Sequence, residues 1–237
     1  MHSPFPAPIP PDMLLLAYQS GIFPMADRRD DPDVFWVEPR ERAIIPLDDF
    51  RLSKSLKKVV RQDRFTVTLN RDFAAVIEAC AAPRPGHPES WISERIIASY
   101  RELHAHGAAH SIECWQAGAE GGEPELVGGL YGVSFDRVFC GESMFSRADN
   151  ASKVALSWLV ALLRHAGFEL LDCQFMTDHL ASLGAVEMSQ ADYLELVAKA
   201  REAPPRLSLN QAYREITGDP AYSSPGKAIA QSFTQTS

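Results

Sequence analysis

RVFCGESMFS (residues 137–146), NASKVALSWLVALLRHAG (150–167) and LLDCQF (170–175) follow one another and predict a strand, a long helix and a second strand. In the helix, Ala155, Leu159 and Leu162 recur at the spacing of one helical face. The segment LLDCQF is nearly continuous in apolar residues, which is typical of a strand that is buried on both faces. We therefore expect this strand near the centre of a sheet.

The segments on either side of this stretch also alternate between strands and helices. Strands are expected at FTVTL (65–69), HSIECW (110–115) and ELVGGLYGV (125–133), and helices at about 52–62, from Asn70, from about 93, at 177–184 and at 189–201. This order is typical of a layered α/β or α+β domain. We expect a small N-terminal domain at residues 1–42, a catalytic domain at 43–203, and a proline-containing, loosely held tail at 204–237.

Composition and charge exclude several classes of protein. The chain has 237 residues, 46% hydrophobic and 23% charged, which excludes a disordered or fibrous chain. Its net charge of −8 argues against a general nucleic-acid coat protein. The four cysteines form no CxxC pair, and no segment has the pattern of a signal peptide or a membrane span. We expect a cytoplasmic protein.

One basic run departs from this acidic background. Residues 51–64, RLSKSLKKVVRQDR, contain six Lys or Arg and one acidic residue. Lys54, Lys57, Lys58 and Arg61 have the spacing of a single helix face. This strip either contacts a phosphate backbone or is simply a solvated helix face.

Three histidines, His104, His106 and His110, are spaced closely enough to suggest a metal site. They span a predicted helix end at Gly107, and no Asp or Glu lies among them. We expect surface histidines and no metal.

Polar residues interrupt two predicted core strands. Glu142 lies within an apolar run, where a carboxylate needs either a structural ion pair or a cationic ligand. Asp172 and Gln174 interrupt LLDCQF and either relay hydrogen bonds to a reacting amine or satisfy nearby backbone groups. Spacing alone favours the structural role for each of these residues, but two such insertions in neighbouring strands strengthen the interpretation as a functional site.

Several segments together resemble the leucyl/phenylalanyl-tRNA–protein transferases. They are GIFPM (21–25), Trp91 with Ile92, HSIECW, LVGGLYGV (126–133), FCGESMFSRADNASKVAL (139–156) and LLDCQFMTDHLASLGA (170–185). The resemblance covers about residues 11–200. It implies an α+β fold, in which a small N-terminal domain precedes a GCN5-related N-acetyltransferase-like domain with a mixed central sheet flanked by helices.

The resemblance also implies an activity and its partners. Such an enzyme moves leucine or phenylalanine, and less readily methionine, from aminoacyl-tRNA to proteins with N-terminal Arg or Lys, which marks them for N-degron degradation. It implies a monomer that needs no membrane. The related acetyltransferases bind coenzyme A through a glycine-rich loop, but the equivalent stretch here, RADNAS (147–152), has no glycine. We therefore expect no cofactor.

Site residues follow from the same correspondence. Glu142 contacts the aminoacyl α-amino group, and Asp172 with Gln174 forms a catalytic relay unless the substrate itself assists proton transfer. Trp91, Tyr100 and Tyr18 hold the terminal adenosine, and the basic strip contacts tRNA phosphates. The amino-acid pocket is lined by Leu130, Phe139, Met144, Leu159, Leu163 and Leu171.

The sequence departs from the common family pattern at Met25, where many members have Trp, and in its short N-terminal extension. Both differences concern tRNA docking.

Two other functions are compatible with the residues: an acyl-coenzyme A N-acyltransferase on the same fold, and a catalytically silent module that binds charged tRNA ends.

Overall fold

The computed structural model describes residues 7–83, 89–118 and 122–234. The elements run in the order α1 (Pro11–Gln19), β1 (Phe23–Met25), β2 (Phe35–Val37), β3 (Glu41–Ile45), the 3-10 helix η1 (Leu47–Asp49), α2 (Lys54–Arg61), β4 (Thr66–Leu69), α3 (Phe73–Ala81), α4 (Glu94–Ala105), β5 (Ala109–Gln116), β6 (Glu125–Phe135), β7 (Val138–Ser146), α5 (Ala151–Ala166), β8 (Leu170–Gln174), α6 (Asp178–Ser182), β9 (Val186–Ser189), α7 (Gln190–Ala200), α8 (Leu209–Gly218) and α9 (Pro225–Ser232).

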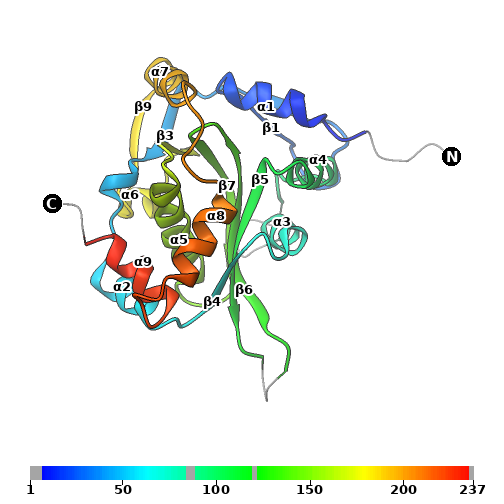
Figure 1. Cartoon of the computed structure of the whole chain (residues 1–237). Coiled ribbons are helices and arrows are strands. Elements are labelled where there is room, and N and C mark those ends of the chain that lie inside the picture. The colour runs from blue at the N-terminus through cyan, green and yellow to red at the C-terminus, as the bar shows by residue number, and fades with distance from the viewer. Residues whose placement is uncertain (1–6, 84–88, 119–121, 235–237) are drawn as a thin grey trace.

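A mixed seven-stranded sheet forms the centre of the fold, in the order β4-β5-β6-β7-β8-β3-β9 (Figure 1). The β7–β8 pair is parallel and the other pairs are antiparallel. Because α5 connects β7 to β8, these three elements form the crossover unit that a parallel pair requires. The expected α+β fold with a mixed central sheet is confirmed.

The parallel pairing of β7 with β8 covers only part of both strands. It joins residues 138–140 to residues 170–172 and ends there, although β7 continues to Ser146 and β8 to Gln174. Beyond this point β7 stays paired with β6 and β8 with β3, and the ends of β7 and β8 both line a cavity, which is described below. The last residues of β8 therefore lie at this cavity.

Helices cover both faces of the sheet. One apolar cluster joins the sheet to α2, α5, α8 and α9, and a second joins it to α1, α3, α4 and α7. Most of α5 is buried, because the sheet lies on one side of it and α2, α8 and α9 pack on the others. This explains why its sequence is apolar around much of the helix.

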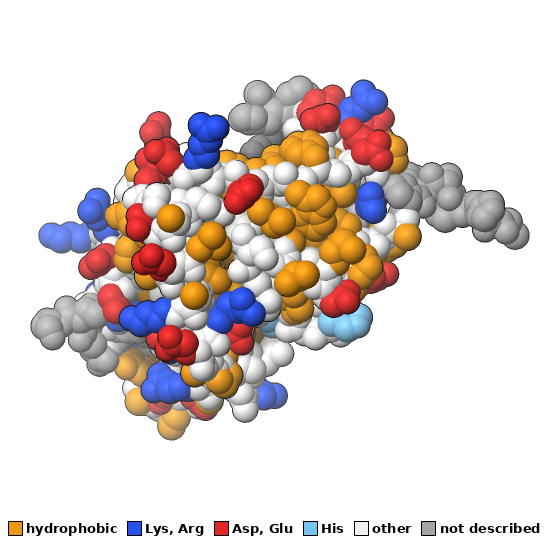
Figure 2. Space-filling model, turned by 90° about the horizontal axis from the view of Figure 1, so that it is seen from above, with side chains coloured by type: hydrophobic (Ala, Val, Ile, Leu, Met, Phe, Trp, Pro, Cys, Tyr) orange, Lys and Arg blue, Asp and Glu red, His pale blue; other side chains and the backbone are white. Residues whose placement is uncertain are grey.

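The N-terminal segment packs against the rest of the chain. Leu14 and Tyr18 of α1 and Phe23 of β1 belong to the same apolar cluster as residues of α3 and α4. In Figure 1, α1 and α7 lie at the top, and the view from above in Figure 2 shows hydrophobic side chains gathered at that surface. These two helices expose Met13, Leu16 and Leu196.

The helix expected from Asn70 begins later. Asn70 has a left-handed backbone, with φ of 58°, and its side-chain oxygen accepts a hydrogen bond from the Ser111 amide. The helix α3 starts at Phe73, and Asp72 caps it by accepting the Ala75 amide hydrogen bond. Asn70 therefore belongs to the turn that precedes the helix.

The prediction of a loosely held tail at 204–237 is wrong for the described residues up to 234. This segment forms α8 and α9, and Leu209, Ala212, Ile229 and Ala230 are buried in the cluster around α5. A capping box at Ser208 and Gln211 begins α8. The prolines lie in the connections and at the start of α9, where proline is tolerated.

Substituting Ile229 tests whether α9 contributes to the core. Ile229→Ala should lower the free energy of unfolding by about 2–5 kcal/mol, because it removes a fully buried side chain. The matched control, Gln231→Ala at an exposed position of the same helix, should change it by less than about 0.5 kcal/mol. Urea denaturation measures both, and equal effects would show that α9 is loosely held.

Candidate active site

A β-bulge in β7 places Glu142. Gly132 of β6 lies opposite Gly141, but the next residue, Tyr131, lies opposite Ser143, so Glu142 is an extra residue in β7. Bulges interrupt the alternation of side chains and redirect them. As a result, Cys140 packs in the cluster with α3 and α4, whereas Met144 packs against the cluster with α5. Strict alternation along the strand would put Cys140, Glu142 and Met144 on one face, and the bulge prevents this.

Glu142 is buried and has only neutral hydrogen-bond partners among the described residues. Its Oε2 accepts a hydrogen bond from the Tyr100 hydroxyl at 3.2 Å, and its Oε1 accepts one from Gln174 Nε2 at 2.7 Å. Burial raises the pKa of Glu142 to about 7; the Asp172 charge adds to this rise, whereas hydrogen bonds from Tyr18, Gln174 and Tyr100 oppose it. No Lys, Arg or His that the structure describes forms an ion pair with Glu142, so its charge is available to a cationic group.

A second bulge lies beside Gln174. Asp172 is opposite Ile44 of β3 and Gln174 is opposite Ala43, so Cys173 is the extra residue. Gln174 also has a positive φ of 61°. Its side-chain nitrogen donates to Glu142, and no hydrogen bond within the described residues uses its side-chain carbonyl. This carbonyl is therefore available as an acceptor.

Asp172 is held by Arg42 in a buried ion pair. The pair joins Arg42 Nη2 to Asp172 Oδ2, and neither side chain is more than 1% exposed. Tyr193 donates a second hydrogen bond to the same oxygen, at 3.2 Å. The other oxygen of Asp172 accepts the backbone N–H of Gln174 at 2.9 Å, so Asp172 contacts the Gln174 backbone and not its side-chain amide.

Arg42 links three parts of the chain around Asp172. Its Nη1 donates to the Gly21 carbonyl at 3.1 Å, and its guanidinium carbon lies 4.2 Å from the centre of the Tyr193 ring. Neither Arg42 nor Tyr193 is expected at the site from the sequence. In the sequence, Arg42 stands out only because it is a charged residue directly before the apolar run AII at 43–45.

Glu142 and Gln174 line one cavity of about 500 Å³. This volume is within the range of small-molecule sites, which are mostly apolar with a few polar groups. Four of the six residues expected to form the amino-acid pocket line it: Leu130, Met144, Leu159 and Leu171. Phe139 and Leu163 do not line it and pack in the apolar cluster around α5 instead. The cavity is also lined by Phe23, Met25, Trp91, Tyr131 and Phe175.

The structure corrects the expected role of two tyrosines. The Tyr18 and Tyr100 side chains are almost completely buried, and their hydroxyls contact each other. The Tyr100 ring also packs edge-to-face on Tyr131. Their rings therefore cannot stack on an adenine base, and they act instead as a hydrogen-bonded support for Glu142. Trp91 is partly exposed at the cavity and keeps a surface for contact.

The basic strip forms on α2 as its spacing predicted. Leu56 and Val60 are buried on the inner side of this helix, while Lys54, Lys58 and Arg61 are exposed and Lys57 is half-buried. None of the four cations forms an ion pair with any residue that the structure describes. The strip is therefore free to contact anions in solution.

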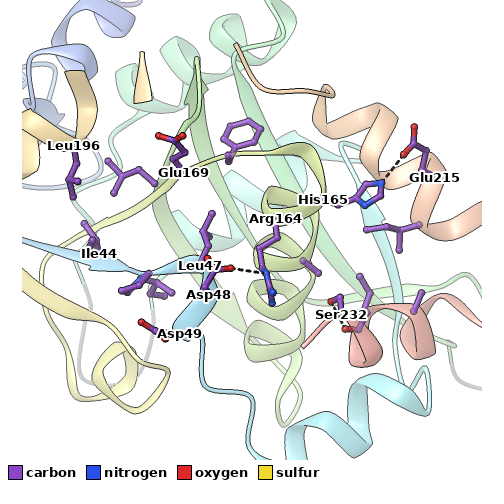
Figure 3. A pocket seen from close by; sticks show the side chains of 18 of the residues that line it. Ile44, Leu47, Asp48, Asp49, Arg164, His165, Glu169, Leu196, Glu215 and Ser232 are labelled. Atoms are coloured by element: carbon purple, nitrogen blue, oxygen red, sulfur yellow. Dashed lines mark hydrogen bonds and ion pairs between the residues drawn. The ribbon is translucent and has the colours of Figure 1, made fainter. Parts of the chain in front are cut away.

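A larger cavity of about 1110 Å³ lies elsewhere, among β3, the end of α5, α8 and α9 (Figure 3). None of the site residues expected from the sequence lines it. Among its charged side chains, Arg164 forms an ion pair with Asp48, and His165 contacts Glu215 at 2.7 Å. The cavity with Glu142 and Gln174 is therefore the candidate active site.

The three histidines have separate hydrogen-bond partners. His104 and His106 contact the backbone carbonyls of Ala109 and Glu102, and His110 lies between Asn70 and Ser134. His110 is buried, contrary to the expectation of surface histidines, and burial lowers its pKa to about 4. Each ring thus has a local structural role.

Comparison with known proteins identifies the family. The model of the family described as "Leucyl/phenylalanyl-tRNA protein transferase" matches residues 44–198, and the model of its N-terminal domain matches residues 8–40. A solved structure, that of L-PGS from Bacillus licheniformis, is only weakly similar, with a TM-score of 0.37 and 14% identity over 72% of this chain and 55% of that one. This likeness supports no argument.

Three named relatives agree with the family models. The leucyl/phenylalanyl-tRNA–protein transferase of Novosphingobium aromaticivorans is 56% identical over 98% of each chain. Those of Rhizorhabdus wittichii and Rhodopseudomonas palustris (strain TIE-1) are 59% and 53% identical, over 80% and 90% of this chain and 74% and 92% of theirs. The chain therefore belongs to the leucyl/phenylalanyl-tRNA–protein transferase family.

Proposed function

We propose that this transferase moves leucine or phenylalanine, and less readily methionine, from aminoacyl-tRNA to proteins that begin with Arg or Lys. The observation that carries the proposal is that Glu142 and Gln174, joined by a 2.7 Å hydrogen bond, line the same largely apolar cavity. Family membership supports the aminoacyl-tRNA donor. We infer from the resemblance that the product enters N-degron degradation in the cytoplasm and that the enzyme acts as a monomer.

The cavity suits the side chain of the donor amino acid. Leu130, Met144, Leu159 and Leu171 present apolar surface, which favours Leu, Phe and Met over polar side chains. A pocket of this kind separates near-isosteres by only about 1–3 kcal/mol. Acceptance of several apolar amino acids is therefore the expected behaviour.

The polar groups have distinct roles in the proposed reaction. Glu142, which has no cationic partner among the described residues, binds the α-ammonium group of the aminoacyl moiety. The free carbonyl of Gln174 accepts a hydrogen bond from the attacking amine and orients it. Asp172 is a positioning residue, because it holds the Gln174 backbone while Arg42 neutralises it. The aminoacyl ester is already activated, so neither a metal nor an organic cofactor is required.

The tRNA is held by residues other than those that act on the reacting groups. Trp91 lines the cavity and is placed to contact the terminal adenosine, with Met25 on the same cavity wall offering a softer surface than an aromatic ring. Lys54, Lys57, Lys58 and Arg61 bind phosphates of the acceptor stem. No helix in the described ranges has the length and apolar character needed to span a bilayer.

A donor assay tests the proposal. Labelled leucine should move from leucyl-tRNA to a peptide that begins with Arg, and not to the same peptide with an acetylated N-terminus. Gln174→Ala should slow transfer about 100-fold. It should change the Kd of leucyl-tRNA by less than about threefold, because the side-chain carbonyl of Gln174 accepts a hydrogen bond from the attacking amine and not from the tRNA. Transfer from acetyl-coenzyme A in place of leucyl-tRNA, or tRNA binding without transfer, would contradict the proposed function.

The pKa of Glu142 near 7 predicts a pH dependence. Below pH 7 the carboxyl is protonated and cannot pair with an ammonium group, so activity should fall as pH falls. The ratio of kcat/KM for wild type to that for Glu142→Gln should rise by up to about tenfold per pH unit from pH 5.5 to about 7, and fall again above about pH 8, where the α-ammonium group of the donor loses its proton. Ionisation of the acceptor amine affects both enzymes and cancels. A constant ratio would remove Glu142 from ammonium binding.

Removing two charges tests the basic strip. The double variant Lys57→Gln, Lys58→Gln should weaken tRNA binding and reduce the slope of log Kd against log salt by about 1.4–1.8, since each phosphate contact contributes about 0.7–0.9. Lys199→Gln is the matched control, because Lys199 is an exposed lysine on α7. An unchanged slope in the double variant would make the strip a solvated surface.

A further inference from the structure

A second hollow adjoins the proposed aminoacyl cavity, and none of the roles above uses it. It has a volume of about 1020 Å³ and lies between the end of α3, the end of β7 and the start of α5. It shares Met144 and His179 with the aminoacyl cavity, whereas the cavity of Figure 3 shares no lining residue with it. We call this adjoining hollow the α5 groove.

The α5 groove carries cations that the aminoacyl cavity lacks. Among the described residues, no Lys or Arg lines the aminoacyl cavity, but Arg147 and Lys153 line the groove. Neither forms an ion pair with any residue that the structure describes. Asp149 is the one acidic residue in the described lining of the groove. An anion in the groove therefore meets a net positive charge.

Neutral contacts hold the Arg147 side chain. Its Nη1 donates a hydrogen bond to the Leu126 carbonyl at 3.2 Å, and its guanidinium carbon lies 5.2 Å from the centre of the Phe145 ring. These contacts position the guanidinium without neutralising its charge. Because a guanidinium has five N–H donors in a fixed plane, its remaining donors suit the oxygens of a phosphate group.

Lys153 occupies a position that the helix itself disfavours. It lies in the first turn of α5, where the positive end of the helix dipole repels a cation. Its charge, together with burial, lowers the pKa of His179, so Lys153 lies near the residue that the groove shares with the aminoacyl cavity. The cation is thus held beside the aminoacyl cavity at a cost to the helix.

The donor of the proposed reaction needs an anion site in this place. The esterified hydroxyl and the 5′-phosphate of the terminal nucleotide belong to the same ribose. When the amino acid occupies its cavity, this phosphate must therefore lie next to that cavity. The aminoacyl cavity itself offers the phosphate only the like charge of Glu142. The adjoining α5 groove offers two cations.

We propose that Arg147 and Lys153 bind the phosphate that joins the terminal adenosine of aminoacyl-tRNA to the preceding nucleotide. This inference rests on the proposed function. It divides tRNA binding into two parts: the α5 groove holds the single-stranded end, and the basic strip of α2 holds the acceptor stem.

Two unreactive donor analogues isolate this phosphate. The first is leucyl-adenosine with an amide in place of the ester, which has no phosphate. The second carries a cytidine joined through a phosphate to its 5′-oxygen. Lys153→Gln should raise the Kd of the second analogue about tenfold, the loss expected for one hydrogen bond to a charged group. It should change the Kd of the first analogue by less than about twofold, and Arg147→Gln should act in the same way.

A stability measurement separates binding from a structural role. Lys153→Gln should have a melting temperature equal to or higher than that of wild type, because it removes a cation from the first turn of α5. The matched control is Lys199→Gln, at an exposed lysine on α7, which should leave both Kd values unchanged.

Three outcomes would contradict parts of this account. Equal losses for the two analogues, or no loss for either, would overturn the assignment of the groove to this phosphate. Coenzyme A also carries phosphates, and it should not displace the second analogue; displacement that Lys153→Gln abolishes would assign the groove to coenzyme A. Absence of leucine transfer from leucyl-tRNA by wild type would instead contradict the proposed function.

Discussion

The buried ion pair between Arg42 and Asp172 is the interaction on which the site depends. Arg42 belongs to β3, Asp172 to β8, and the same guanidinium donates to Gly21 of the N-terminal segment and lies on the Tyr193 ring of α7. A buried pair gains little net stability over an apolar pair, but loss of one partner leaves an uncompensated charge that costs about 3–5 kcal/mol. The pair therefore acts by fixing geometry: with Asp172 held, its second oxygen holds the backbone of Gln174 in a left-handed conformation.

Much of the fold could be predicted from local patterns. The helices expected from about residue 93, at 177–184 and at 189–201 form as α4, α6 and α7, each capped by a side chain at its start: Ser93, Thr177 and Ser189. Gly167 ends α5 in a left-handed conformation. The strands β5 to β8 follow from their apolar runs. The short strands β3 and β9 were not predicted. β3 pairs with β8, more than 100 positions away in the sequence, and β9 is only four residues long. The C-terminal helices α8 and α9 were not predicted, because the prolines of this segment indicated an irregular tail. Its few apolar residues, such as Ile229, gave too weak a pattern to indicate that they are buried in the core.

The residue types of the site were easier to predict than its contacts. Glu142, Asp172 and Gln174 are conspicuous because each interrupts an apolar strand. Alternation alone could not place their side chains, because one bulge makes Glu142 an extra residue and another does the same for Cys173. A bulge depends on the register of the neighbouring strand, which is a property of the assembled sheet. For the same reason, Tyr18 and Tyr100 could be expected near the site, but not as buried supports of a carboxylate.

The two carboxylates of the site, Asp172 and Glu142, thus have opposite electrostatic surroundings. Asp172 has an arginine, a tyrosine hydroxyl and a backbone amide, so its charge is neutralised within the protein. Among the described residues Glu142 has only neutral partners, two tyrosine hydroxyls and the Gln174 amide, and burial raises its pKa to about 7. A neutralised carboxylate is a fixed anchor, whereas a buried carboxylate without a cation gains most from a cationic ligand. Exchanging these surroundings would exchange the roles: the residue paired with arginine would no longer attract an ammonium group, and the other would no longer hold Gln174 in place.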